Sequence, residues 1–162
     1  MMGVGKSTIG KILAKKLKLK FIDIDRVIET REKSTVSEIF KKKGEIYFRK
    51  IEKKITLDQL KKNNSIIALG GGAFINTSIR REVKNTSISF WLDLDLENLL
   101  SRLKNIKKRP LLDENNLRKS MNKIYSDRKR IYNEANFRID CNFIDKEKIL
   151  KKIVELYENS RN

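Results

Sequence analysis

The sequence predicts an α/β fold with a parallel sheet, and three observations carry this expectation. Short apolar runs alternate along the chain with longer amphipathic stretches, as in proteins where each strand is followed by a covering helix. A Gly-Lys-Ser turn leads into an amphipathic stretch near the start, and three consecutive glycines follow a later apolar run. The 162 residues suit a single compact domain over 1–162 and leave little room for a second.

The first half of the chain should hold two strands and three helices. The first helix should begin in the Gly-Lys-Ser turn, because apolar residues recur behind it at helical spacing. Residues 21–25 read as a strand that runs into a polar end, and 65–69 as a short buried strand. Between them, Thr-Val-Ser-Glu at 35–38 is typical of a capping box that opens a short helix, which Gly44 could stop. A longer helix should follow.

The second half should continue the alternation. A strand is expected at 88–92, and Asp95 is placed to cap the helix after it. Residues 104–116 are polar and charged and include the only proline, so we interpret them as a loop or lid. The remaining elements are a helix from Leu117 to about Tyr132, a strand from Phe137 to Asp140 and a last helix with Ile149, Leu150, Ile153, Val154 and Tyr157 on one face.

The charge of the chain is strongly basic. Lys and Arg number 38 against 21 Asp and Glu, which gives a formal net charge of +17. Such an excess suits a nucleic-acid partner or phosphorylated ligands, but lysines also commonly coat exposed helix faces. Because the lysines are spread along the whole chain, we favour the surface interpretation and expect no nucleic-acid partner.

The histidine and cysteine counts narrow the chemistry. The absence of histidine excludes Ser-His-Asp and Cys-His catalysis, so a proton acceptor must be a carboxylate, Lys, Tyr or Cys. The single cysteine, Cys141, cannot form an internal disulfide, suits a reducing compartment and is best read as a small buried residue. No stretch approaches the roughly 20 apolar residues of a membrane span. We therefore expect a cytoplasmic protein with no membrane partner.

A phosphate-binding loop is the first candidate site. The residues Gly3, Val4, Gly5, Lys6, Ser7 and Thr8 match the end of the Walker A pattern G-x-x-x-x-G-K-[ST]. Glycines let backbone N–H groups turn toward phosphate oxygens, and Lys6 adds a positive charge. Ser7 would offer its hydroxyl to Mg²⁺. The alternative is a chance Gly-Lys-Ser turn that opens a basic helix.

Two further patterns follow expected strands. Asp23 and Asp25 end the strand at 21–25, where period-two geometry would put both carboxylates on one face, roughly 6.5 Å apart. One could hold Mg²⁺ while the other accepts a hydroxyl proton, although an Asx turn with a helix cap is the alternative. The second pattern is the run Gly70, Gly71 and Gly72, which would let backbone amides approach a small polar ligand, or would simply form a tight turn.

The order and spacing of several short motifs resemble the shikimate kinase family over nearly the whole chain. These motifs are Gly3-x-Gly5-Lys6-Ser7-Thr8-Ile9-Gly10, Asp23-x-Asp25, Ile39-Phe40, Gly44-Glu45-x-x-Phe48-Arg49-x-x-Glu52, Leu69-Gly70-Gly71-Gly72-Ala73, Arg109-Pro110-Leu111-Leu112 and Arg128-x-x-x-Tyr132. The resemblance implies a three-layer P-loop kinase fold with a parallel five-stranded sheet and a mobile lid over about 104–116. It also implies a phosphotransferase that moves the γ-phosphate of ATP onto the 3-hydroxyl of shikimate, in the pathway to chorismate and the aromatic amino acids.

The resemblance also implies a role for each site residue. The loop residues Gly3, Gly5, Lys6, Ser7 and Thr8 would hold the ATP phosphates, and Ser7 and, through water, Asp23 would serve Mg²⁺. Asp25 would bind shikimate hydroxyls and act as the base. The shikimate carboxylate would be bound by Arg49 and Arg128, with Gly70, Gly71 and Gly72 lining the same pocket. Arg109 would reach the transferring phosphate from the lid, and Arg102 would lie near adenine. Without the resemblance, any one of these arginines would be read as a surface residue.

The chain departs from the family pattern in two places. Residues 141–144 lack a basic residue that some members place near adenine, so that part of the nucleotide site is unassigned. The first Walker A glycine would fall one position before Met1, and members normally begin with a central strand leading into the loop. We expect the native product to extend upstream by about one short strand, roughly 5–10 residues. A shorter and compromised protein is the alternative.

Two other functions compete with this interpretation. Another small-molecule kinase of the same fold, such as a gluconate kinase or a nucleoside monophosphate kinase, would share the loop and the lid. Asp25, Arg49, the three glycines and Arg128 favour an acidic polyol instead. The second alternative is a basic nucleic-acid-binding protein or an inactive paralogue, for which no stacking motif is found. We expect a monomer whose partners are ATP and shikimate.

Overall fold

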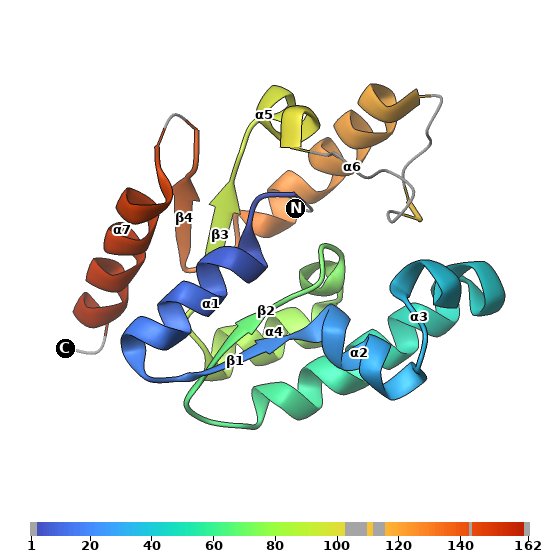
Figure 1. The fold of residues 1–162 in the computed structure, drawn as a ribbon, viewed down its shortest axis with the longest axis horizontal. Helices are drawn as coiled ribbons and strands as arrows, with labels where there is room; N and C mark the ends of the chain where they lie inside the picture. Colours follow the sequence, from blue (N-terminus) through green and yellow to red (C-terminus); the bar gives the residue numbers. More distant parts are fainter. Residues whose placement is uncertain (1–2, 103–109, 112–115, 143, 161–162) are drawn as a thin grey trace.

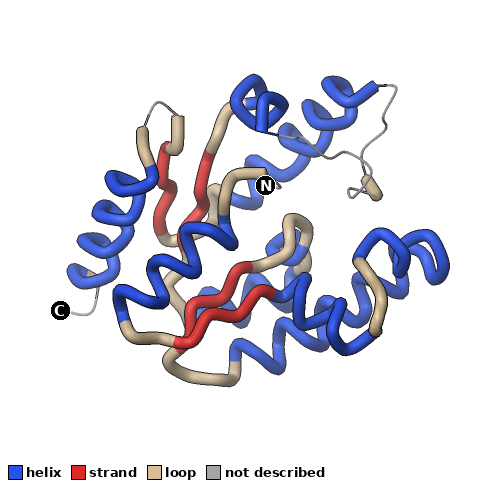
Figure 2. Tube along the Cα trace, viewed as in Figure 1, coloured by secondary structure: helices blue, strands red, loops and turns tan. Residues whose placement is uncertain are grey.

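The described residues contain four strands, which pair in parallel two by two. The computed structural model describes residues 3–102, 110–111, 116–142 and 144–160. Within these ranges β1 (Lys20–Asp23) pairs with β2 (Ser65–Ala68), and β3 (Phe90–Asp93) pairs with β4 (Phe137–Asp140), both in parallel. The pairs form two separate sheets in the described part of the chain, visible as two red pairs in Figure 2. The predicted parallel α/β class is confirmed, with four of the five strands that the resemblance implied.

Helices lie on both sides of the strands. The helices are α1 (Lys6–Leu17), α2 (Ile24–Glu32), α3 (Val36–Leu60), the 3₁₀ helix η1 (Ala73–Ile75), α4 (Thr77–Thr86), α5 (Leu96–Arg102), α6 (Leu117–Tyr132) and α7 (Lys146–Asn159). In the view of Figure 1, α1 lies between the two strand pairs, and α4 lies behind β1 and β2. Helix α1 contacts both strands and α7. It therefore connects the β1–β2 pair with the last helix of the described chain.

Local side-chain signals set most helix ends where the sequence predicted them. The Thr35 hydroxyl accepts from the Glu38 backbone N–H, and the Glu38 carboxylate accepts from the Thr35 N–H, which completes the predicted capping box of α3. Gly44 interrupts α3 with φ 79° and ψ 170°, so the short helix ends where predicted and a second begins immediately. Asp95 accepts from the Asn98 N–H at 2.8 Å and caps α5 as expected.

The strand expected at 21–25 is shorter than predicted. β1 ends at Asp23, and Ile24 already begins α2. The cause is local, because the Asp23 carboxylate accepts from the Arg26 backbone N–H and so caps the new helix. Asp25 therefore lies in the first turn of α2, and the period-two argument that put both carboxylates on one face of a strand is wrong.

The strand expected at 88–92 also begins later, at Phe90. Just before it, the Asn136 side-chain oxygen accepts from the Ser89 N–H at 3.0 Å and from the Ser89 hydroxyl at 2.7 Å. The Ser89 backbone N–H is therefore bonded to a side chain instead of to a backbone carbonyl of the neighbouring strand. The regular pairing with β4 starts one residue further on, with Phe90 opposite Phe137.

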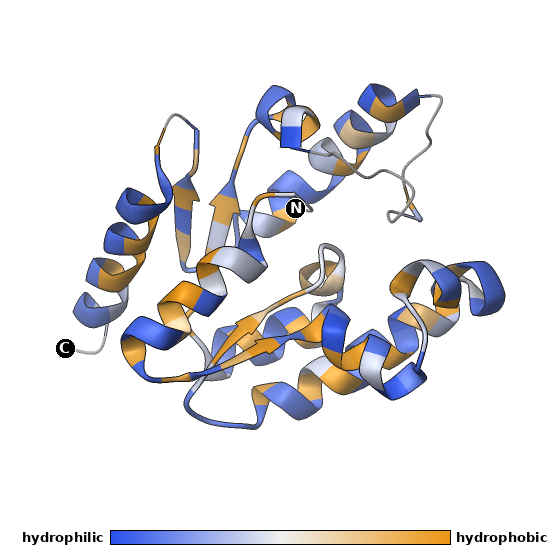
Figure 3. Cartoon of the chain, in the orientation of Figure 1, coloured by the Kyte–Doolittle hydropathy of each residue, from blue (hydrophilic) through white to orange (hydrophobic). Residues whose placement is uncertain are grey.

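Two clusters of buried side chains form the core. The larger lies among α1, η1, α4, the β3–β4 pair, α6 and α7, and the smaller consists of Ile24, Ile28, Ile39, Phe48 and Ile55 on α2 and α3. Ile67 and Leu69 pack against both clusters. Figure 3 shows apolar residues concentrated in β1 and β2. Cys141 is buried as predicted, whereas Ile12, one of the apolar residues of α1, is 41% exposed.

The lid expected over about 104–116 falls almost entirely outside the described residues, and Arg109 with it. Among the described residues, no helix combines the length and apolar character that crossing a membrane requires.

Candidate functional site

The glycine-rich loop opens α1 in the geometry of an anion site. Gly3 and Gly5 have φ values of 77° and 93°, which side chains disfavour, and α1 begins at Lys6 directly behind them. Val4 is buried between the two glycines and fixes the loop to the core. The first N–H groups of α1 thus face the space in front of the loop, where the helix dipole favours negative charge.

One cavity joins this loop to Asp23, Asp25 and Gly71. Its volume is about 260 Å³, and it is lined by Gly3, Gly5, Lys6, Ser7, Thr8, Asp23, Asp25, Ala68, Leu69 and Gly71. The loop, both aspartates and Gly71 therefore share one space, although Asp25 comes from a helix. A larger hollow of about 570 Å³ lies along β1 and is lined by side chains such as Phe21, Val27 and Arg31. It includes Asp23 but none of the other predicted site residues.

Ser7 and Asp23 lie in direct contact. The Ser7 hydroxyl donates to the Asp23 carboxylate at 2.5 Å, at the edge where α1 and β1 meet. Mg²⁺ prefers oxygen ligands and is usually held by one or two protein groups together with substrate phosphates. Among the described residues there is no cluster of three or more acidic, Cys or His side chains. A hydroxyl and a carboxylate beside the phosphate loop fit such an ion.

The acceptor side of the cavity is built around Gly70. A Cβ atom at this position would lie 2.5 Å from Glu52 Oε1 and 2.7 Å from Asp25 Oδ1. Both carboxylates therefore reach the glycine backbone, one from α3 and one from α2. Glu52 is 2% exposed, and its Oε1 has no hydrogen-bond partner among the described residues. This oxygen is a buried acceptor directed toward the predicted acceptor pocket.

Arg49 and Glu52 form a partly buried ion pair on one face of α3. Arg49 Nη1 lies 2.6 Å from Glu52 Oε2, and Arg49 also contacts Glu45 at 3.1 Å. Burial raises the pKa of Glu52, and the Arg49 guanidinium opposes that rise. Burial acts to lower the pKa of Arg49, but the charge of Glu52 and the hydrogen bonds to Glu52 and Glu45 together outweigh it, so the pKa is raised. The guanidinium lies against Gly72, where an added Cβ would come within 2.5 Å of Nη1.

Helix α6 supplies the opposite wall. Arg128 Nη1 donates to the Gly71 carbonyl at 2.7 Å, and the Tyr132 hydroxyl donates to the same oxygen. These residues are four apart and lie on one face of α6. Burial raises the pKa of Tyr132. Arg128 and Arg49 thus approach the glycine run from two different helices.

Sequence reasoning missed two contributors to the acceptor side, one on α3 and one on α6. Glu52 and Tyr132 stood in the quoted motifs but received no role. Their signals were the spacings Arg49-x-x-Glu52 and Arg128-x-x-x-Tyr132, which put each beside an arginine on a helix face.

The predicted adenine-side residue lies apart from this cavity. Arg102 is the last residue of α5 and is exposed. It is close enough to Cys141 to influence the thiol, because burial and the Asp140 charge raise the pKa of Cys141 to about 11 while the Arg102 charge opposes that rise. Arg102 therefore lies near Cys141, the residue that follows β4, and its place near adenine stays a prediction. Arg109 lies outside the described residues.

Comparison with known proteins places this geometry in a family. The family model described as shikimate kinase matches residues 2–158. A shikimate kinase of Persephonella marina is 41% identical over 138 residues, which cover 85% of this chain and 83% of the relative. One of Bartonella henselae is 38% identical over 154 residues, covering 95% of this chain and 73% of the relative.

Solved structures agree. Shikimate kinase from Acinetobacter baumannii in complex with shikimate superposes with a TM-score of 0.93 at 31% identity, covering 98% of this chain and 89% of that one. Shikimate kinase from Aquifex aeolicus gives a TM-score of 0.87 at 32% identity, covering 99% and 94%.

Proposed function

The chain belongs to the shikimate kinase family, and from this premise we propose which of its residues carry out the transfer of phosphate from ATP to the 3-hydroxyl of shikimate. The observation that supports the assignment is the single cavity that joins the phosphate loop to Asp25 and Gly71. A donor site and an acceptor site must adjoin for direct transfer, because phosphoryl transfer depends on positioning and charge stabilisation.

The donor side is the loop of α1. We assign Gly3, Val4, Gly5, Lys6, Ser7 and Thr8 to the ATP phosphates and Arg102 to the region near adenine. Backbone N–H groups and the Lys6 charge would hold the phosphate oxygens. Ser7 and, through water, Asp23 would hold Mg²⁺, which when bound neutralises charge on the β- and γ-phosphates.

The acceptor side is the space enclosed by α2, α3, the glycine run and α6. Shikimate is a small anion, and Arg49 and Arg128 would bind its carboxylate by charge-assisted hydrogen bonds. Gly70, Gly71 and Gly72 would let the ring approach the backbone. Glu52 holds Arg49 in place through the 2.6 Å ion pair, so the guanidinium is oriented before substrate arrives.

Asp25 is the proposed general base. It lines the cavity between the phosphate loop and the glycine run. As the 3-hydroxyl oxygen bonds to the γ-phosphorus, the bond from that phosphorus to the β,γ-bridging oxygen breaks, and Asp25 accepts the hydroxyl proton. The chain has no histidine that could take this role.

The test of the function is substrate dependence. Purified protein with ATP and Mg²⁺ should form ADP only when shikimate is added, measured by a coupled ADP assay. Equal turnover with gluconate or with a nucleoside monophosphate would overturn the assignment of the acceptor. Salt-dependent DNA binding without shikimate-dependent turnover would favour the basic binding protein instead.

Arg109 is proposed to reach the transferring phosphate from the lid. Arg109→Ala should then lower kcat far more than it weakens shikimate binding, because the charge acts on the transition state. Loss of a transition-state arginine in phosphoryl transfer costs roughly 10³–10⁵ in rate, and less where other cations share the charge. An increase in the KM for shikimate alone would move Arg109 to the acceptor site.

We also propose that the enzyme acts as a monomer in the cytoplasm. The single cysteine supports a reducing compartment. Light scattering after size exclusion should give a mass near 19.0 kDa, and cell fractionation should recover the activity in the cytosol.

A further inference from the structure

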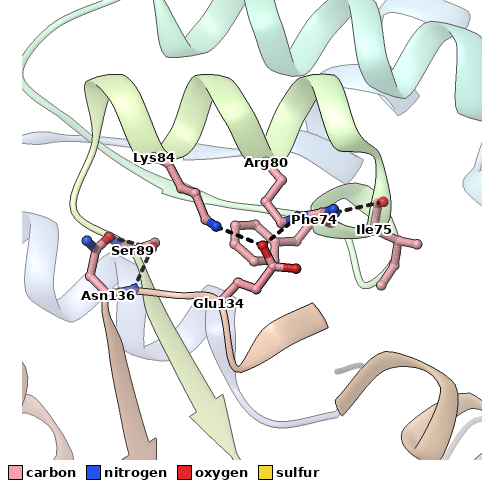
Figure 4. A network of polar contacts seen from close by, with 7 residues as sticks. All are labelled: Phe74, Ile75, Arg80, Lys84, Ser89, Glu134 and Asn136. Atoms are coloured by element: carbon pink, nitrogen blue, oxygen red, sulfur yellow. Dashed lines mark hydrogen bonds and ion pairs between the residues drawn. The ribbon is translucent and has the colours of Figure 1, made fainter. Parts of the chain in front are cut away.

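Arg80 links α4 to the segment that follows the glycine run. Its Nη1 donates to the carbonyl oxygens of Phe74 and Ile75 at 3.1 and 3.0 Å, and its Nε donates to Glu134 at 3.1 Å (Figure 4). The Arg80 side chain is only 15% exposed. One guanidinium therefore holds two carbonyls of η1 and a carboxylate that lies 54 residues further along the chain.

Glu134 is anchored in the turn that leaves α6. Its carboxylate also accepts from Lys84 at 2.7 Å, and the Lys84 hydrogen bond lowers the pKa of Glu134, so the charge persists at neutral pH. Asn136 in the same turn exchanges hydrogen bonds with Ser89, as Figure 4 also shows. The turn that carries Glu134 is thus tied both to α4 and to the start of β3.

These contacts close a ring that ties the glycine run to the end of α6. Tyr132, two residues before Glu134, donates to the Gly71 carbonyl. On the other side, the glycine run is bonded into η1 through Ala73 N–H to Gly70 O and Ile75 N–H to Gly72 O, both at 3.1 Å. Arg80 joins the two sides, because it holds η1 with one nitrogen and Glu134 with another.

We propose that Arg80 and Glu134 are positioning residues for shikimate binding. They fix the distance between the glycine run and α6, and hence the direction in which Arg128 points. The proposal rests on the assignment of Arg128 and the glycine run to the shikimate carboxylate. An exposed ion pair alone contributes little, so the decisive contacts are the two η1 carbonyls that Arg80 bonds. Neither residue touches the phosphate loop, so we expect these contacts to affect the binding of shikimate and not that of ATP.

The test compares two substitutions on α4. Arg80→Ala should raise the KM and the Kd for shikimate by about tenfold or more, the scale of losing charge-assisted hydrogen bonds, with the KM for ATP within twofold of wild type. Lys84→Ala is the matched control, because Lys84 bonds the same Glu134 carboxylate but no η1 carbonyl. It should leave both KM values within twofold. If the KM and the Kd for shikimate were the same in Arg80→Ala as in the wild type, the proposal would be overturned.

A charge swap separates the carbonyl contacts from the ion pair. The double variant Arg80→Glu with Glu134→Arg can restore the pair, but a glutamate cannot donate to the carbonyls of Phe74 and Ile75. Its KM for shikimate should therefore stay raised, and a return to the wild-type value would overturn the role of the carbonyls. If Arg80→Ala folds poorly, Arg80→Lys keeps the charge but gathers its donors on a single nitrogen, so it should give an intermediate Kd for shikimate by calorimetry. A wild-type Kd would count against the proposal.

Arg128→Ala in the same assay distinguishes this proposal from the site assignment. A large rise in the KM for shikimate in Arg128→Ala, with none in Arg80→Ala, would reject the ring of contacts and leave the pocket intact. No change in Arg128→Ala would reject the pocket assignment itself, and with it the premise of the ring.

Discussion

At the scale of single residues, the acceptor pocket depends on the missing side chain of Gly70. Two carboxylates lie where a Cβ would be, Glu52 Oε1 at 2.5 Å and Asp25 Oδ1 at 2.7 Å. Glu52 cannot easily move away, because it is 2% exposed and its other oxygen is bonded to Arg49 at 2.6 Å. A methyl group here would therefore be accommodated by displacing the proposed base.

Gly70→Ala should consequently impair turnover while leaving the fold intact. A displacement of about 1 Å in a reacting group can cost on the order of 100-fold in rate, so we expect kcat to fall by about that factor. Steady-state kinetics and the urea midpoint should be measured together. A kcat within threefold of wild type would mean that Asp25 does not need its present position.

The role of Asp25 can be tested by an isosteric change. Asp25→Asn removes the negative charge and the basicity, and general base catalysis contributes roughly 10²–10⁴ in rate. We expect kcat to fall within that range while the KM for ATP changes little. Asp58→Asn, an exposed aspartate elsewhere on α3, is the control and should behave as wild type. If Asp25→Asn retains near-wild-type kcat, positioning and phosphate charge stabilisation carry the reaction without a base.

At the scale of elements, a buried carboxylate fixes α6 to both strands of the β3–β4 pair. Asp93 is 3% exposed and accepts from the Tyr125 hydroxyl at 3.0 Å and from Arg138 Nε at 2.9 Å. Tyr125 lies one turn before Arg128 on α6. The polar triad thus sets the placement of the helix that carries a proposed substrate arginine.

Tyr125→Phe should lower stability in a pH-dependent way. Burial and the bond to Asp93 raise the pKa of Tyr125 from 10.0 to about 12. The folded state therefore binds this proton more tightly than the unfolded state, so its stabilisation is complete below pH 10 and is lost as the pH rises toward 12. We expect a loss of about 1 kcal/mol at pH 7 from the missing hydrogen bond. The wild-type advantage in urea unfolding should shrink between pH 10 and 12, and an advantage that grew there would contradict the assignment.

The elements show where sequence reasoning succeeds and why it fails. The capping box at Thr35 and the bounds of α6 were predicted because both depend on local signals. The strand at 21–25 was overextended because Phe21, Ile22 and Ile24 suit a strand, whereas the Asp23 side chain bonds the backbone ahead of it and starts a helix. That competition between side chain and ladder depends on tertiary context.

Dependence on tertiary context also limits what the sequence predicts about the site. The residues Asp25, Arg49, Gly70 and Arg128 were predicted from a resemblance, and their convergence in the fold supports it. The bond of Tyr132 to Gly71 spans 61 positions in the sequence. Neither partner carries a local pattern that reveals the other, so contacts of this kind require the folded chain.

At the scale of the whole molecule, the acceptor pocket lies between the two core clusters. Asp25, Arg49 and Glu52 belong to α2 and α3, which contain the smaller cluster, whereas Arg128 and Tyr132 belong to α6, which packs on the larger one. Few side chains join the clusters, among them Ile67 and Leu69. A region with its own small core can open separately from the rest of a domain.

Bound shikimate should therefore suppress the opening of α2 and α3 more than any other motion. A ligand at about 100 times its Kd stabilises the binding-competent state by about 2.7 kcal/mol, which corresponds to about 100-fold slower exchange wherever opening releases it. We expect amide exchange in peptides covering 24–49 to slow by up to that factor when shikimate is added. Helix α7 carries none of the proposed site residues, so local fraying of this helix does not release shikimate. Amide exchange by that route in peptides from α7 should therefore slow much less. Gluconate at the same concentration is the control and should change neither exchange rate.

Uniform protection of α7 and of 24–49 would mean that the two clusters open as one unit. No protection of 24–49 would mean that shikimate does not bridge them, because a ligand held by Arg49 on one side and Arg128 on the other must be released when either side opens.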